Sequence, residues 1–251
     1  MAAEKTLAIV LRVVDFSETS CVVTLFTRDF GKIGALAKGA RRPKSPFESA
    51  LDLMAVCRIV FLHKSSDALD LLTEAKLERR FRSAERNLSC LYAGYYVVEL
   101  LSELTHTSDP HPELFDLADR TLIQLDSGTN IAPVVMHFEL NALRVLGHLP
   151  LLGECVGCGK QIPESRRIAF GQLAGGVLCQ QCRVGQKQVV NVSTDTIHAL
   201  SLFSQPGDAD TCRRAIEPRL MGEMRGLLNQ YFNNLLGHRP RTQKLLTSVL
   251  K

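Results

Sequence analysis

The first 80 residues alternate between apolar and polar positions with a period of two, the pattern of half-buried β-strands. Turn-forming residues divide this region into five expected strands, at residues 6–14, 21–27, 32–38, 51–61 and 69–78. Five strands joined by short turns and one longer loop favour a small antiparallel barrel, and the OB-fold is the common five-stranded barrel. Periodicity alone leaves other small barrels and sheets open.

From residue 81 onward the period of the apolar positions changes to that of helices. The pattern predicts helices at residues 87–104, 113–125, 133–147, 194–203 and 218–236. The first is apolar almost all round and is expected to be buried, whereas the last is amphipathic and is followed by a glycine, a typical C-terminal cap. We expect the final fourteen residues to form a basic tail.

The change of period predicts an α+β protein with two domains. We expect an OB-fold barrel at residues 1–80, followed by a helical domain at residues 81–251. No apolar run reaches the roughly 20 residues of a membrane-spanning helix, and the first residues lack the pattern of a secretory signal. We therefore expect a soluble, cytoplasmic protein with no membrane partner.

Four of the eight cysteines form two C-x-x-C pairs separated by twenty residues, Cys155 with Cys158 and Cys179 with Cys182. In a reducing cytoplasm such pairs indicate metal binding rather than disulfides. Two pairs can supply the four sulfurs of a zinc ribbon, and four thiolates leave no open position for a substrate. We predict one structural Zn²⁺ per chain, in an insert at about residues 153–185. The other cysteines are expected to be small buried residues: Cys21, Cys57, Cys90 and Cys212.

The net charge of +4 is distributed unevenly along the chain. Residues 1–80 carry a net charge of +3, residues 81–150 of −5, and residues 151–251 of +6. The densest cationic run, Lys-Gly-Ala-Arg-Arg-Pro-Lys at 38–44, has four cations and no acid. Such a run can be merely a solvated loop, but it is also what a nucleic-acid phosphate backbone attracts.

One pair of residues in the helical region also fits a motif of a class of enzymes. His137 and Glu139 fit the H-x-E element of zinc deaminases, with the first cysteine pair as the remaining ligands. However, Glu154 stands where that motif has proline, and the second cysteine pair would have no role. His137 also lies off the apolar face of its expected helix, so we expect a surface histidine. No nucleotide-binding or nucleophile motif is present, and we expect a protein that is not an enzyme.

The order of these parts resembles the RecO family of bacterial recombination-mediator proteins over essentially the whole chain. The motifs that carry the resemblance are Ala-Ile-Val-Leu-Arg at 8–12, Phe-Thr-Arg-Asp-Phe-Gly-Lys at 26–32, Ala-Lys-Gly-Ala-Arg-Arg-Pro-Lys-Ser at 37–45, Tyr-Val-Val-Glu-Leu at 96–100 and Phe-Glu-Leu at 138–140. The most specific elements are the Lys-Gly-Ala-Arg segment and the complete set of four cysteines.

The resemblance implies a function in recombinational DNA repair. Members of the family bind single- and double-stranded DNA and anneal complementary strands. With RecR they load RecA onto DNA coated by single-stranded-DNA-binding protein, without hydrolysing a nucleotide. Carried onto this sequence, the resemblance implies DNA contacts at Lys32, Lys38, Arg41, Arg42 and Lys44. It also implies a cytoplasmic protein associated with the nucleoid.

Base stacking within the barrel region would have to use phenylalanine, because residues 1–80 contain neither Trp nor Tyr. The candidates are Phe16, Phe26, Phe30 and Phe61. Most of these are expected in the core, so affinity should come mainly from phosphate charge and should depend steeply on salt.

A second candidate surface is the basic helical end of the chain, which could bind DNA or the acidic tail of the single-stranded-DNA-binding protein. Its cations are Arg213, Arg214, Arg219 and Arg225. Two further classes of function remain open on the residues alone. One is a zinc-containing OB-fold protein that binds RNA, and the other is a scaffold whose insert holds only protein partners.

Overall fold

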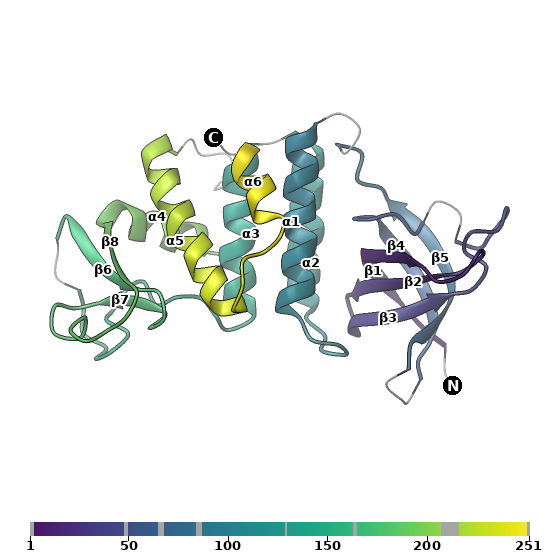
Figure 1. The fold of residues 1–251 in the computed structure, drawn as a ribbon, viewed down its shortest axis with the longest axis horizontal. Coiled ribbons are helices and arrows are strands. Elements are labelled where there is room, and N and C mark those ends of the chain that lie inside the picture. The colour runs from purple at the N-terminus through teal and green to yellow at the C-terminus, as the bar shows by residue number, and fades with distance from the viewer. Residues whose placement is uncertain are drawn as a thin grey trace. The chain divides into compact units, whose positions relative to one another are not determined.

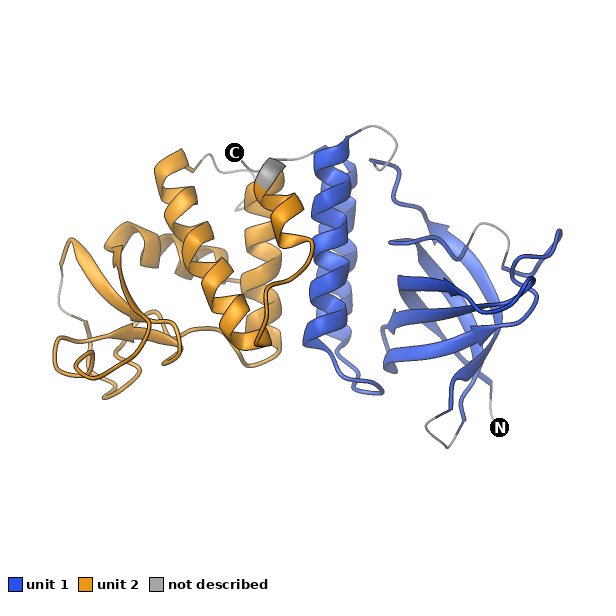
Figure 2. Cartoon of the chain, in the orientation of Figure 1, with its two compact units in different colours: residues 1–128 blue, residues 129–251 orange. Residues whose placement is uncertain are grey.

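The computed structural model describes residues 3–47, 50–64, 68–83, 87–128, 130–162, 165–206 and 216–249. The chain forms two compact units, Met1–Gly128 and Thr129–Lys251 (Figures 1 and 2). The architecture is a mixed α+β one, with β-strands at the N-terminus and mainly helices after them. None of the described helices is long and apolar enough to cross a membrane.

Five strands of the first unit close into a barrel in the order β1-β2-β3-β5-β4. Their bounds are β1 (Ala3–Asp15), β2 (Cys21–Thr27), β3 (Gly31–Ala37), β4 (Val56–Leu62) and β5 (Asp70–Arg79). β3 and β5 pair in parallel, and the other neighbouring pairs are antiparallel. Side chains including Val10, Leu25, Ile59 and Leu72 fill the interior. The prediction of five strands is confirmed.

The fourth strand begins later than the apolar alternation suggested. Residues 52–55 form a turn, in which the N–H of Met54 donates to the carbonyl of Val10 and the N–H of Val10 donates to the carbonyl of Ala55, both at 3.0 Å. Met54 and Ala55 are nevertheless buried. Leu51, Leu53 and Ala55 continue the alternation of apolar residues in the sequence although the backbone turns there, so the predicted start at residue 51 is wrong.

Two helices complete the first unit, α1 (Leu88–Leu104) and α2 (Pro112–Asp126). Asn87 caps the start of α1 with its side-chain oxygen. α2 lies against the outside of the barrel, where the rings of Phe26 and Phe115 are 6.3 Å apart and Arg28 donates to Asp116 at 3.0 Å. The compact unit therefore includes both helices and extends beyond residue 80.

The second unit contains helices and one small sheet (Figure 1). Its described helices are α3 (Ile131–Val145), α4 (Thr194–Phe203), α5 (Pro218–Leu236) and α6 (Gln243–Val249). Its sheet has the order β7-β6-β8, with bounds β6 (Arg167–Gly171), β7 (Gly176–Leu178) and β8 (Val189–Ser193). The five helices expected from the sequence correspond to α1 and α2 of the first unit and to α3, α4 and α5 of the second, and each is confirmed to within two residues at each end. The three short strands were not predicted individually.

Two expectations for the helical unit are wrong. The basic tail contains α6, whose Leu246 is buried and whose Gln243 donates to the side chain of Asn229 on α5 at 3.1 Å. His137 is buried rather than exposed. Beside it, Asn141 donates to the carbonyl of Phe203 at the end of α4, so α4 covers this face of α3.

Candidate nucleic-acid interface and metal centre

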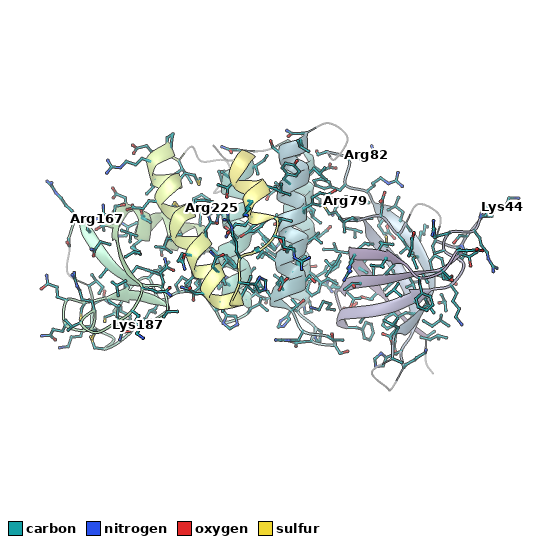
Figure 3. The ribbon with its side chains drawn as sticks, viewed as in Figure 1. Lys44, Arg79, Arg82, Arg167, Lys187 and Arg225 are labelled. Carbon is teal, nitrogen blue, oxygen red and sulfur yellow. The ribbon has the colours of Figure 1, made fainter. Side chains whose placement is uncertain are left out.

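The cationic run forms a loop of turns directly after β3, as predicted over its described part. Lys38, Arg41, Arg42 and Lys44 are all exposed on this loop. Gly39 adopts a φ of +71°, which side chains disfavour, and its carbonyl accepts a hydrogen bond from the N–H of Arg42 at 3.0 Å. In Figure 3, Lys44 projects from the side of the barrel that lies away from α1 and α2. We call residues 38–44 the cationic loop.

The cationic loop is fastened to the turn that joins β1 and β2. The N–H of Arg41 donates to the carbonyl of Thr19 at 3.1 Å, and the N–H of Gly39 donates to the hydroxyl of Ser20 at 3.3 Å. These bonds hold the backbone of the cationic loop against the barrel. The long side chains then start from defined positions, which lowers the entropy lost when they bind a partner.

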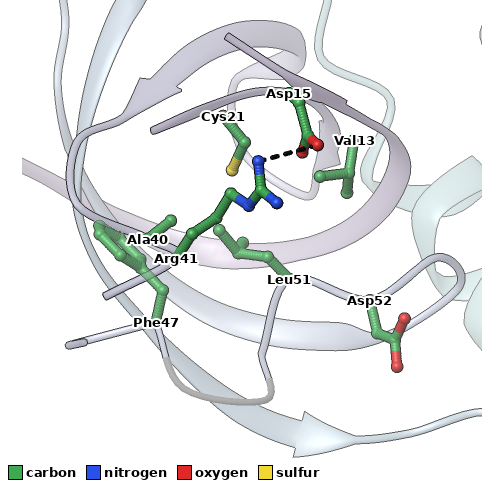
Figure 4. A pocket seen from close by; sticks show the side chains of 8 residues that line it. All are labelled: Val13, Asp15, Cys21, Ala40, Arg41, Phe47, Leu51 and Asp52. Atoms are coloured by element: carbon green, nitrogen blue, oxygen red, sulfur yellow. Dashed lines mark ion pairs between the residues drawn. The ribbon is translucent and has the colours of Figure 1, made fainter. Parts of the chain in front are cut away.

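Arg41 lies over a pocket of about 200 Å³ at this edge of the barrel and forms an ion pair with Asp15 at 2.9 Å (Figure 4). Cys21 also lines the pocket, and burial, with a smaller effect of Asp15, raises the pKa of its thiol. The side chains of Arg41 and Asp15 remain 49% and 69% exposed. An exposed pair of this kind is worth only about 0–1 kcal/mol, so another anion can compete with Asp15 for Arg41.

Lys32 differs from the other four candidate DNA contacts. Its ammonium donates to the carbonyls of Ser102 and Thr105 at the C-terminal end of α1, at 2.6 and 2.5 Å. Burial lowers the pKa of the Lys32 side chain, while helix C-termini favour a nearby cation. Lys32 therefore connects β3 to α1, and it lies outside the exposed group on the cationic loop.

Of the phenylalanines considered for base stacking, two are fully buried, Phe26 and Phe61. Phe30 packs edge-on against Phe61, with ring centroids 5.3 Å apart. Phe16, directly after β1, is 65% exposed. The structure thus leaves Phe16 as the phenylalanine of this set whose ring is available to a ligand.

The structure describes two of the four arginines proposed for the basic helical end, and they differ in exposure. Arg213 and Arg214 lie outside the described residues, and Arg219 is exposed at the start of α5. Arg225, however, is only 8% exposed and pairs with the fully buried Glu139 of α3. The assignment of Arg225 to a binding surface is therefore wrong, because the carboxylate that it neutralises lies in the core.

The four paired cysteines come together in the second unit, as their spacing predicted. Their sulfur atoms all lie within 4.8 Å of one another, and the sulfurs of Cys158 and Cys179 are 3.9 Å apart. Zn–S bonds of about 2.3 Å would put tetrahedral sulfurs about 3.8 Å apart, so the cluster has the dimensions of a metal site. Gly157 passes close to it, since a Cβ at that position would lie 3.1 Å from the Cβ of Cys182.

The surroundings of Cys155 and Cys179 favour thiolates, the form in which cysteine binds metals, whereas hydrogen bonds with the neighbouring thiols raise the pKa of Cys182 to about 12. Burial raises the pKa of the Cys155 thiol, but amide N–H groups of Cys179, Gly157 and Cys158 together outweigh burial and lower the pKa to about 6. The N–H of Cys182 likewise lowers the pKa of Cys179. The donor set and the amides directed at it therefore fit a structural metal ion bound by four cysteines.

The remaining cysteines fit their predicted role as far as the structure describes them. Cys21, Cys57 and Cys90 are buried, and Cys212 lies outside the described residues.

The sequence did not single out Asp15, Thr19 or Ser20, which hold the cationic loop in place. No motif marks them, because each acts through a contact between segments that are about twenty residues apart.

A five-stranded barrel with a cationic loop, followed along the chain by a helical unit that carries a four-cysteine cluster, defines a class of two-part α+β proteins. Comparison with known families identifies the member of this class. The models described as Recombination protein O N terminal and Recombination protein O C terminal match residues 1–81 and 85–244.

Individual relatives agree with this assignment over nearly their whole length. The chain is 44% identical to DNA repair protein RecO of Rhodopirellula baltica, over 97% of this chain and 99% of that protein. It is 32% identical to DNA repair protein RecO of Myxococcus xanthus, over 96% of each chain. It is 31% identical to DNA repair protein RecO of Anaeromyxobacter dehalogenans, over 99% of this chain and 98% of that protein. The chain belongs to the RecO family of DNA repair proteins, a family of recombination mediators and not of enzymes.

Proposed function

We propose that this chain binds single- and double-stranded DNA through the cationic loop and anneals complementary strands. In this proposal it acts with RecR to load RecA onto DNA covered by single-stranded-DNA-binding protein. The observation that carries the proposal is the set of four exposed cations on a loop fastened to the barrel: Lys38, Arg41, Arg42 and Lys44. Phosphate contacts of this kind give affinity without reading sequence.

We further propose that the barrel is an OB-fold. The strand order β1-β2-β3-β5-β4, closed through β1 and β4 and with β3 parallel to β5, supports this. OB-folds bind oligonucleotides on strands 2 and 3 and on the loops beside them. The cationic loop follows β3 directly and bonds to the turn before β2, which is where a ligand of such a barrel is expected.

The four-cysteine cluster is proposed to hold one structural zinc ion. Zinc in a four-thiolate site contributes folding energy and leaves no position for a substrate. The metal would stabilise the insert that contains β6 and β7, whose buried core is small: Cys155, Ala169 and Leu178. A core of this size gives little stability without a cross-link.

The first prediction concerns the two arginines of the cationic loop. Arg41→Ala with Arg42→Ala should weaken binding to all DNA sequences alike and flatten the plot of log affinity against log salt. The slope should fall in magnitude by about 1.4 for single strands and by about 1.8 for duplex, because two phosphate contacts are lost. Fluorescence anisotropy of labelled oligonucleotides across a salt series measures both.

A charge-matched control is Arg82→Ala with Arg120→Ala, which removes two exposed arginines of the same unit outside the cationic loop. The control should keep the wild-type slope. Equal loss of slope in both double variants would show that net charge, and not the cationic loop, determines binding.

The second prediction concerns Asp15, which competes with phosphate for Arg41. Asp15→Asn should raise DNA affinity by roughly 2- to 5-fold, the range that corresponds to losing an exposed ion pair. The gain should largely disappear when Arg41→Ala is also present. Glu18→Gln removes the same charge from the turn that directly follows Asp15 and serves as the control. Identical gains for Asp15→Asn and Glu18→Gln would attribute the effect to general charge repulsion.

A further inference from the structure

Phe16 is an unusual residue for the surface of a barrel. Its ring is 65% exposed, whereas Phe26, Phe47 and Phe61 of the same barrel are buried. The turn that begins at Phe16 is held by its own hydrogen bonds, from the N–H groups of Phe16 and Ser17 to the carbonyl of Ser20, at 3.0 and 3.1 Å. An aromatic ring is thus presented to solvent on an ordered turn, without a packing role to explain it.

The ring lines a surface pocket together with two cations of the cationic loop. The pocket has a volume of about 380 Å³, and its lining includes the apolar side chains of Phe16 and Leu36 and the cations Lys38 and Arg42. Small-molecule pockets typically have volumes of about 300–1,000 Å³. Thr19 and Ser20 add polar atoms to the lining.

The pocket has a stable frame because it lies where the β1–β2 turn and the cationic loop are bonded together. Gly39, which also lines it, donates to the hydroxyl of Ser20, and the N–H of Arg42 donates back to the carbonyl of Gly39. The side chain of Arg42 lies over Gly39, with its Cδ 3.5 Å from the position that a Cβ would take. The aromatic ring and the guanidinium therefore border one recess.

We propose that this pocket takes one unpaired nucleobase, which stacks on the ring of Phe16 while Lys38 and Arg42 contact the phosphates beside it. The inference rests on the proposed function and adds to it a subsite for bases. Every base has a π-face that can stack on an aromatic ring, so the subsite is tolerant of sequence. In duplex DNA both faces of each base are covered by neighbouring base pairs, so only single strands can use the subsite.

The test compares the wild-type protein and Phe16→Ala on three probes of equal length. The probes are an ordinary single strand, a single strand of abasic sites that keeps the phosphates, and a duplex. Phe16→Ala should bind the ordinary strand about 5- to 150-fold more weakly, the range expected for losing one stacked base. Its binding to the abasic strand and to the duplex should be unchanged, and Phe16→Trp should restore binding to the ordinary strand.

Two controls separate stacking from apolar contact and from misfolding. Phe16→Leu keeps apolar surface without an aromatic plane and should behave like Phe16→Ala. Val14→Ala removes another exposed apolar side chain from the same end of β1 and should bind like the wild-type protein. Unfolding curves for all variants should coincide, since Phe16 has little buried surface to lose.

The outcomes distinguish this subsite from the proposed function. If the wild-type protein binds all three probes and Phe16→Ala binds the ordinary strand equally well, the subsite is refuted and phosphate binding stands. If Phe16→Ala loses affinity for all three probes equally, the ring supports the turn rather than a base. If the wild-type protein binds none of the probes, the proposed function fails and the subsite fails with it.

Discussion

Replacing Cys155 by serine is expected to remove the metal and unfold the insert that surrounds the cluster. Structural zinc contributes about 10–16 kcal/mol of apparent folding free energy in zinc-finger peptides, more than the small core around Cys155 can supply. The zinc content should fall from one ion per chain to nearly none. The amides of β6 and β7 should then exchange hydrogen rapidly, while the barrel of the first unit keeps its protection.

A matched control is Cys90→Ala, which removes a buried thiol that lies outside the cluster. This variant should lose at most a few kcal/mol of stability and keep a full complement of zinc. Elemental analysis of the purified chain measures the metal directly. Well under one zinc per wild-type chain, together with an unchanged Tm for Cys155→Ser, would refute the structural-zinc proposal.

Glu139→Ala is expected to lower the free energy of unfolding by about 3–5 kcal/mol, because it leaves the charge of Arg225 buried without its carboxylate. Glu139 is fully buried and Arg225 is 8% exposed, so water compensates neither charge effectively. The pair joins α3 to α5, two of the helices that form the second unit. Urea unfolding followed by circular dichroism measures the loss.

The control replaces both members of the pair with leucine. A buried ion pair can often be exchanged for apolar residues at little cost, so Glu139→Leu with Arg225→Leu should recover most of the stability that Glu139→Ala loses. A loss below about 1 kcal/mol in Glu139→Ala would place the pair in the class of exposed ion pairs and contradict the role assigned to it.

The elements with strong periodic patterns could be predicted from the sequence. The helix at residues 218–236 has an uninterrupted apolar face, a proline at its start and a glycine after its end, and the structure contains it as α5 (Pro218–Leu236). The four cysteines were equally clear, since two C-x-x-C pairs require only local turns to present their sulfurs. Signals of this kind depend on a few neighbouring residues and survive without knowledge of the rest of the fold.

Predictions that depended on what covers a helix or strand were less successful. Periodicity places His137 and Arg225 on particular faces, but it does not show that α4 covers the first or that Glu139 lies opposite the second. Lys32 resembles the other cations in sequence, and only the approach of α1 to β3 gives its ammonium two carbonyl partners. These contacts join segments far apart in the chain, so no local pattern encodes them.

The boundary errors have a related physical cause. The start of β4 was misplaced because Leu51, Leu53 and Ala55 continue the apolar alternation through a turn that precedes the strand. The helix α6 (Gln243–Val249) was missed because seven residues hold too few apolar positions to establish a period among several cations.

The measurement that tests the account most directly is the anisotropy of a labelled single-stranded oligonucleotide with the wild-type protein, from about 50 to about 200 mM salt. The complementary strand is added at the end. Four phosphate contacts from the cationic loop predict tight binding with a log–log slope of about −3 for a single strand, followed by pairing faster than without the protein. Binding that is absent at low salt, or unaffected by salt, would contradict the assignment of the cationic loop as the DNA-binding surface.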